Sequence, residues 1–121
     1  MKYYIDIITD IGEPITIQHH IDLLRYATTH DTIEISINSR GGYYSSILYL
    51  AASMRACEAK LVVLYYGEFH SLLPLLEEAD IVVLMPDSTM YTDQNDKITI
   101  ESLTSRFNAI THYEYLSLPK G

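Results

Sequence analysis

The sequence contains a single cysteine, Cys57, and no tryptophan among its 121 residues. One cysteine excludes an internal disulfide and leaves no second thiolate for a structural zinc site. Cys57 follows an apolar stretch with helical spacing, so we interpret it as a small, buried hydrophobic residue. The five histidines show no spacing typical of metal ligands. The sequence therefore predicts neither a metal nor another cofactor.

Positive charge is also scarce. The sequence has eight Lys and Arg residues and sixteen Asp and Glu residues, which gives a net charge of −8. Such a surface repels phosphate backbones and anionic lipids, so we expect neither nucleic acid nor a membrane as a partner. No apolar run approaches the roughly 18 residues of a membrane span. The opening stretch "MKYYIDIITD" alternates apolar and polar residues, unlike a signal peptide. We expect a soluble cytoplasmic protein.

The length fits one domain, residues 1–121, and 48% hydrophobic residues are enough for a core. Period-two or continuous apolar runs predict strands over 3–9, 32–38, 60–66 and 81–85, and "STMYTDQN" adds a short one. Helical spacing of apolar residues predicts helices over 16–29, 44–57, 71–78 and 99–114. This alternation predicts an α/β fold of repeated β-α-β units, with mostly parallel strands and right-handed crossovers.

Gly41 and Gly42 form the first candidate site, at the carboxyl end of the strand over 32–38. Glycines there can adopt positive φ and point their N–H groups outward beside a helix start. Such a concavity suits a phosphate, a thioester enolate or a tetrahedral oxyanion. The alternative interpretation is a tight turn with no ligand.

Ser71 is the second candidate, after the strand over 60–66 and at the start of a short helix. It either caps that helix or acts as a nucleophile. A nucleophile needs an oxyanion hole, a base and a group that orients the base. The diglycine loop and the amide of Leu72 are candidates for the oxyanion hole.

Three segments, "INSRGGYYSSILYLAASM", "YYGEFHS" and "MPDSTMYTDQ", together resemble the proteolytic subunit of Clp proteases, a family with a crotonase-type fold. That family has I-N-S-P-G-G before a helix, then G-x-A-A-S-M-G-A, then P-N-S-R-x-M-I-H-Q. The resemblance covers about residues 33–94. It implies that Ser71 is at the nucleophile position and that Gly41, Gly42 and Leu72 form the oxyanion hole.

The resemblance places Asp93 where the family has its catalytic histidine. No residue between Asp93 and Gly121 matches the third member of the triad. An aspartate, with a reference pKa of about 3.9, is a poor proton acceptor for an alcohol at neutral pH. The resemblance therefore implies a protein that keeps the nucleophile and the oxyanion corner but has lost its peptidase activity, or in which this activity is severely weakened.

The resemblance also implies an assembly. The family's handle region, through which two rings stack, is missing here, so we expect a homo-oligomeric single ring, and eleven tyrosines suit such contacts. The implied role is a scaffold or a modifier of proteolysis, with an ATP-dependent unfoldase or an active Clp subunit as partner. So small a member suggests a viral origin.

Two other functions remain open. The chain is an active serine peptidase if His70 or His112 serves as the base for Ser71. It is a crotonase-like acyl-binding protein if the diglycine loop holds a thioester carbonyl. His19, His20 and His30 lie in or just after the first helix, and we expect them to be exposed.

Overall fold

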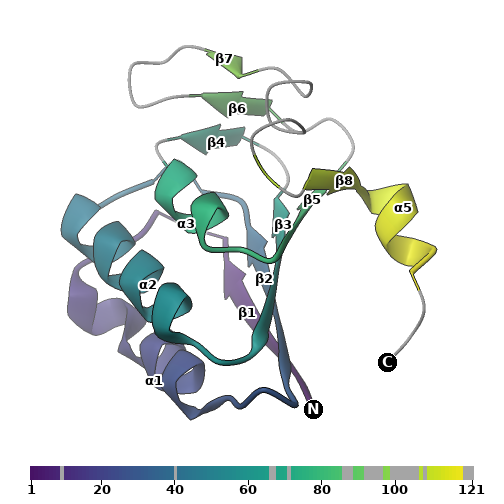
Figure 1. Cartoon of the computed structure of the whole chain (residues 1–121). Helices are drawn as coiled ribbons and strands as arrows, with labels where there is room; N and C mark the ends of the chain where they lie inside the picture. Colours follow the sequence, from purple (N-terminus) through teal and green to yellow (C-terminus); the bar gives the residue numbers. More distant parts are fainter. Residues whose placement is uncertain are drawn as a thin grey trace.

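Five parallel strands form the central sheet (Figure 1). The computed structural model describes residues 1–8, 10–39, 41–65, 68–70, 72–85, 89–91, 97–98, 107 and 109–118, with the backbone alone at 68–70, 89–91, 97–98 and 112. The strand order is β1-β2-β3-β5-β8, with the bounds Lys2–Ile7, Thr32–Ile37, Lys60–Tyr65, Ile81–Leu84 and Ala109–Thr111. The strands predicted over 3–9, 32–38, 60–66 and 81–85 are confirmed with small shifts at their ends.

Helices α1, α2 and α3 all cover one face of this sheet (Figure 1). The first four strands are added in one direction, so successive right-handed crossovers place their helices on the same side. The bounds are Gln18–Tyr26 for α1, which follows the 3-10 turn η1 (Pro14–Ile17), Tyr44–Ala56 for α2 and Leu73–Glu77 for α3. Within the described ranges, no helix combines the length and apolar composition of a membrane span.

The main core lies between the sheet and these helices. Alternate residues of β2 point into it, and Ile33, Ile35 and Ile37 have no exposed surface. Parallel pairing keeps the layers in register, since Ile35 pairs with Ile5 on one side and with Val63 on the other. The helices contribute buried residues at the expected spacing, among them Ile21, Leu24, Ile47, Leu50 and Met54.

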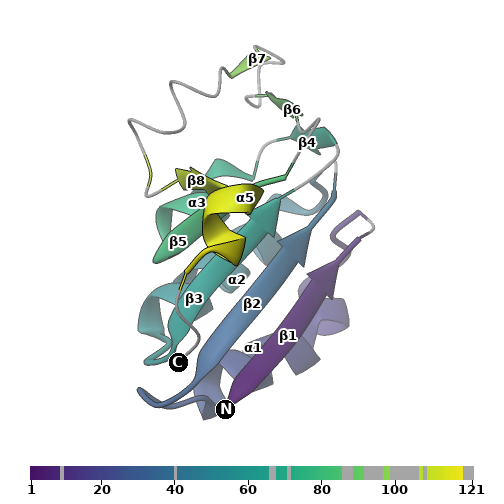
Figure 2. The ribbon, with the colours of Figure 1, turned by 90° about the vertical axis from the view of Figure 1, so that its right-hand side faces the viewer.

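The opposite face is covered in part by α5 (His112–Leu116), which lies in front of the sheet in Figure 2. Beneath it, Val62, Leu64 and Val83 form a small second core. Tyr115 extends from α5 to β2 and donates a hydrogen bond of 2.7 Å to Glu34, which also pairs with Lys2 at 2.8 Å. The carboxylate of Glu34 holds the pKa of Lys2 above its usual range.

The helix predicted over 99–114 is wrong over Ala109–Thr111 and correct from His112 onwards. Residues Ala109–Thr111 form β8 and pair with β5, with Ile110 beside Val83. The apolar spacing in this region resembles a helix, but the free edge of β5 needs a partner, and a neighbouring strand outweighs local propensity. The helix begins only at His112, after a capping box in which Thr111 and Glu114 exchange hydrogen bonds of 3.1 and 2.7 Å.

A second, three-stranded sheet lies beyond the carboxyl ends of the central strands (Figures 1 and 2). It contains β4 (Glu68–His70), β6 (Thr89–Tyr91) and β7 (Lys97–Ile98). The short strand predicted within "STMYTDQN" is therefore confirmed as β6. The strands β4 and β7 were not predicted, because two or three residues are too few to show a period.

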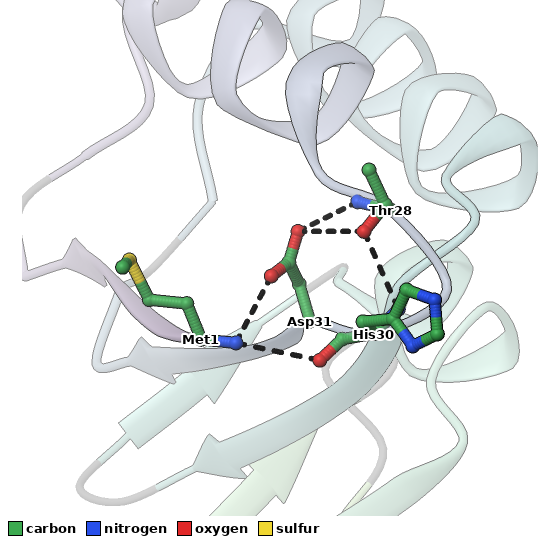
Figure 3. Close-up of polar contacts among 4 residues, drawn as sticks. All are labelled: Met1, Thr28, His30 and Asp31. Atoms are coloured by element: carbon green, nitrogen blue, oxygen red, sulfur yellow. Dashed lines mark hydrogen bonds and ion pairs between the residues drawn. The ribbon is translucent and has the colours of Figure 1, made fainter.

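The connection from α1 to β2 is held by the side chain of Asp31 (Figure 3). The helix predicted over 16–29 ends at Tyr26, and the chain then turns. One carboxylate oxygen of Asp31 accepts hydrogen bonds from the Thr28 amide at 2.7 Å and the Thr28 hydroxyl at 3.2 Å. The other oxygen pairs with the Met1 amine at 3.1 Å. These donors, the Thr28 amide foremost, hold the pKa of Asp31 below its usual range.

We expect the Asp31 contacts to make the stability of the protein depend on pH in the acidic range. Because the pKa is lower in the folded state, the ionised carboxylate stabilises the fold above its unfolded pKa of about 3.9, and this contribution is lost as the pH falls through the folded value. Asp31→Asn should reduce the free energy of unfolding at pH 7, and this deficit should disappear as the pH falls through the folded pKa of Asp31. Urea denaturation from pH 7 to pH 2.5 tests this, with the exposed Asp10→Asn as control for net charge. A deficit that is constant with pH would contradict it.

Candidate active site

The candidate site lies beyond the C-terminal ends of β2 and β3, at one end of the central sheet. This is the edge where α/β sheets generally bind ligands, because loops and helix starts converge there. From β2 the chain passes through Ser39 and the diglycine to α2. From β3 it passes through β4 to α3, and the second sheet lies at the same end (Figure 1).

The diglycine loop has the backbone that the sequence predicts. Gly41 has φ 102° and Gly42 has φ 146°, both in the region that favours glycine. The loop is clamped to Ile11, whose amide donates to the Gly41 carbonyl at 2.7 Å and whose carbonyl accepts from the Tyr43 amide at 3.0 Å. A Cβ at Gly42 would lie 1.9 Å from the Ile11 carbonyl oxygen. The close approach of two backbones therefore requires glycine at position 42.

Ser39 fixes the other side of the loop. Its side chain is buried, and its Oγ accepts a hydrogen bond from the Gly41 amide at 3.1 Å and donates one to the Gly41 carbonyl at 3.2 Å. The Gly41 N–H is therefore occupied within the loop. Among the described residues, no acceptor is bonded to the Gly42 N–H. Of the two glycines, Gly42 is thus the better candidate to donate to an oxyanion.

Leu72 is held rigidly at the second corner. It is fully buried with Leu75 and Leu76, and its carbonyl accepts from the Leu75 amide at 3.0 Å. Leu72 occupies the N-cap position of α3, and Pro74 lies in the first turn, where proline is tolerated. The cap position, one of the two roles considered for Ser71, is therefore occupied by Leu72, and α3 begins after it.

Ser71 and Asp93 lie outside the described residues, so their predicted roles stay predictions. The strands that lead to them are described. In the second sheet, β4 and β6 are parallel, and His70 pairs with Tyr91. The segment that leads into Ser71 thus lies beside the segment that leads towards Asp93.

Three of the other histidines have described side chains. His19 and His30 are exposed as predicted, whereas His20 is half-buried on α1. Burial lowers the pKa of His20, and the His19 ring, 3.9 Å away between centroids, acts in the same direction. For His70 and His112 the backbone alone is described, so their proposed roles as bases stay predictions.

A groove of about 510 Å³ lies at the opposite edge of the sheet, between the end of α2 and the start of β3. It is lined by Cys57 and Lys60, with Arg55 and Glu78 paired at 2.6 Å in its wall. Burial raises the pKa of the Cys57 thiol, which makes it a poor nucleophile. Nowhere in the described ranges do three His, Cys, Asp or Glu residues gather as metal ligands would. This groove is remote from the candidate chemistry.

The sequence matches no protein-family model, and no curated protein matches it either. Among solved structures, the chain is similar to the 1510-N membrane-bound stomatin-specific protease, determined as a mutant with a substrate peptide. The TM-score is 0.57 at 10% identity, over 85% of this chain and 54% of that one, so the chain spans about half the length of the protease. That protease has a fold of the Clp-protease and crotonase type. The likeness supports the predicted α/β fold class with its parallel sheet.

Proposed function

We propose that this chain is a Clp-protease-like subunit that keeps the nucleophile position and the oxyanion corner but has lost, or severely weakened, its peptidase activity. In this proposal it assembles as a single homo-oligomeric ring and serves as a scaffold or a modifier of proteolysis. An active Clp subunit or an ATP-dependent unfoldase is the proposed partner.

The observation that carries the proposal is the diglycine corner. Gly41 and Gly42 both have positive φ, a backbone that other residues rarely adopt, and Ile11 and Ser39 clamp the loop in this conformation. The clamp orders the loop while no described acceptor takes the Gly42 amide. An ordered donor without a partner is what stabilisation of a developing oxyanion requires.

The strand pairing in the second sheet supports the placement of the other residues. Parallel strands carry their chains in one direction, so β4 and β6 lead towards a common edge. Ser71 follows β4 directly, and Asp93 follows β6 after one intervening residue. This arrangement favours a shared pocket for the nucleophile position and the position of the missing base.

The chemistry of Asp93 argues for weak activity. A carboxylate with a pKa near its reference value of about 3.9 neither accepts the serine proton efficiently nor returns one to a leaving amine. Triad members act as a unit, and the loss of one removes a factor of about 10⁴ or more from turnover. Binding and oxyanion stabilisation would remain.

A serine-directed fluorophosphonate probe tests this proposal. We expect no labelling of the wild type on the timescale that labels an ordinary serine protease, because no base activates Ser71. Asp93→His supplies an imidazole and should raise the labelling rate, and this gain should disappear when Ser71→Ala is added. Ser45→Ala, at an exposed serine of α2, is the matched control.

Two outcomes would contradict the proposal in different ways. Labelling of wild-type Ser71 would show an active peptidase with another base. Failure of Asp93→His to gain any labelling, in a folded protein, would show that the two positions do not share a pocket.

A further inference from the structure

Apart from Arg55 in its last turn, helix α2 has no charged residue, although the protein is highly charged elsewhere. From Gly41 to Met54 the sequence has no charged residue, although 20% of the chain is charged. A helix on the surface of a protein normally carries a polar outer face, and one that is apolar all round is normally covered. The outer face of α2 is therefore unusual for a surface exposed to water.

Three exposed apolar residues of α2 form a stripe with a spacing of four. The other exposed residues of this helix are Ser45, Arg55 and Ala56. Tyr44 is 62% exposed, Leu48 is 46% exposed, and Ala52 is also exposed. Both sides of the helix contact neighbouring elements. Tyr49 contacts Arg25 of α1 on one side, and Arg55 pairs with Glu78, which follows α3, on the other. Figure 1 shows α2 between α1 and α3, with the sheet along one side of all three. The stripe faces away from every described element.

Two further exposed apolar side chains lie near the start of the helix. Tyr43 is 54% exposed, and Ile15, on η1, is 80% exposed. The 3-10 turn packs against the start of α2, where the Ser46 hydroxyl donates to the Gly12 carbonyl at 2.6 Å. We call these five residues the α2 patch: Ile15, Tyr43, Tyr44, Leu48 and Ala52. Aromatic and aliphatic side chains without charge are typical of the centre of a protein interface.

We propose that the α2 patch binds the same patch of a second copy of this chain, with the two α2 helices antiparallel about a two-fold axis near Leu48. A two-fold contact requires a self-complementary surface. Centred on Leu48, the pairing sets Tyr44 of each copy against Ala52 of the other, a large side chain against a small one. Leu48 meets its own equivalent at the axis.

Charge is compatible with a second copy as the partner. Two chains with a net charge of −8 repel each other unless they meet through surfaces without carboxylates, as the α2 patch provides. Arg55, in the last turn of α2, already pairs with Glu78 of its own chain and lies outside the patch. The absence of basic residues from the patch disfavours a lipid surface.

This contact is independent of the proposed peptidase corner. It uses the outer face of the helix layer, and a ring requires a different, head-to-tail contact. The probe experiment on Ser71 and the assembly experiment below therefore succeed or fail separately.

Size-exclusion chromatography with light scattering is the first test. The wild type at about 100 µM should have at least twice the protomer mass of 13.8 kDa. Leu48→Glu buries two like charges at the axis, and Ala52→Glu buries a charge against Tyr44 of the other copy. Each should raise the dissociation constant ~100-fold or more. Tyr113→Glu, at an 82% exposed tyrosine on α5, is the matched control and should leave the mass unchanged. Circular dichroism confirms that each variant is folded.

Disulfide trapping tests the orientation. With Cys57 replaced by alanine, Leu48→Cys should form an intermolecular disulfide on mild oxidation, because equivalent residues meet at the axis. A mixture of Tyr44→Cys and Ala52→Cys chains should cross-link to each other more than either does to itself. A wild type that is monomeric at about 100 µM overturns the proposal. So does a Leu48→Glu variant with the same mass as the wild type.

Discussion

Gly42→Ala should destabilise the protein by about 4 kcal/mol or more, because the added methyl group has no space. The new Cβ would lie 1.9 Å from the Ile11 carbonyl oxygen and 2.7 Å from both the carbonyl carbon and the nitrogen of Ile11. All three are backbone atoms of a paired segment, so they cannot move aside without breaking the clamp. The φ of 146° adds strain for any L-residue. Since domains are stable by only about 5–15 kcal/mol, much of the variant should be unfolded or aggregated.

Gly12→Ala is the matched control. Its Cβ would also be close to an atom, the Thr16 Oγ1 at 2.9 Å, but that atom is the end of an exposed side chain that can rotate away. We expect a loss of no more than about 1 kcal/mol. Urea denaturation of both variants measures the difference. Equal losses, or a Gly42→Ala variant as stable as the wild type, would mean that the loop does not approach Ile11 as closely as the structure shows.

The central strands could be predicted because each carries its own signal. The stretch "TIEISIN" alternates strictly, and only one of its faces is buried, so local period and tertiary burial agree. Residues 61–65 are apolar without interruption, and the structure covers them on both faces, by the helices on one side and by α5 on the other. In both strands, the local pattern of apolar residues therefore predicts which faces of the strand are buried.

The chain end could not be predicted in the same way. Phe107 and Ile110 have a spacing that suits a helix, but the residues around Ile110 form a strand because β5 offers an open edge. That edge is more than twenty residues away in the sequence, and a local window does not detect it. One local signal did exist: Thr111 with Glu114 is a capping box, and it marks the true start of α5.

Some features of the candidate site could likewise be predicted from the sequence, and others could not. Gly41 and Gly42 could be assigned positive φ from their position alone, and the structure confirms it. The clamp by Ile11 joins segments about thirty residues apart in the sequence. Neither hydrophobic periodicity nor a sequence motif predicts such a contact. The capture of the Gly41 amide by Ser39, which leaves Gly42 as the better donor, is likewise visible only in three dimensions.

Leu50→Ala and Leu48→Ala should have opposite consequences, although the two leucines are two residues apart on one helix. Leu50 is fully buried and Leu48 is 46% exposed. Truncation of a buried leucine costs about 3 kcal/mol through lost burial and the cavity left behind, whereas the exposed position should cost less than about 0.5 kcal/mol. Urea denaturation at a concentration where the chain is monomeric measures both, because association adds to apparent stability.

The same pair of variants separates folding from association. Leu48→Ala should weaken self-association of the folded chain, while Leu50→Ala, whose side chain never reaches the surface, should leave the dissociation constant nearly unchanged as long as the protein is folded. If the monomer loses as much stability from Leu48→Ala as from Leu50→Ala, then residue 48 is covered by its own chain. The α2 patch would in that case not be a free surface, and the two-fold contact would have no place to form.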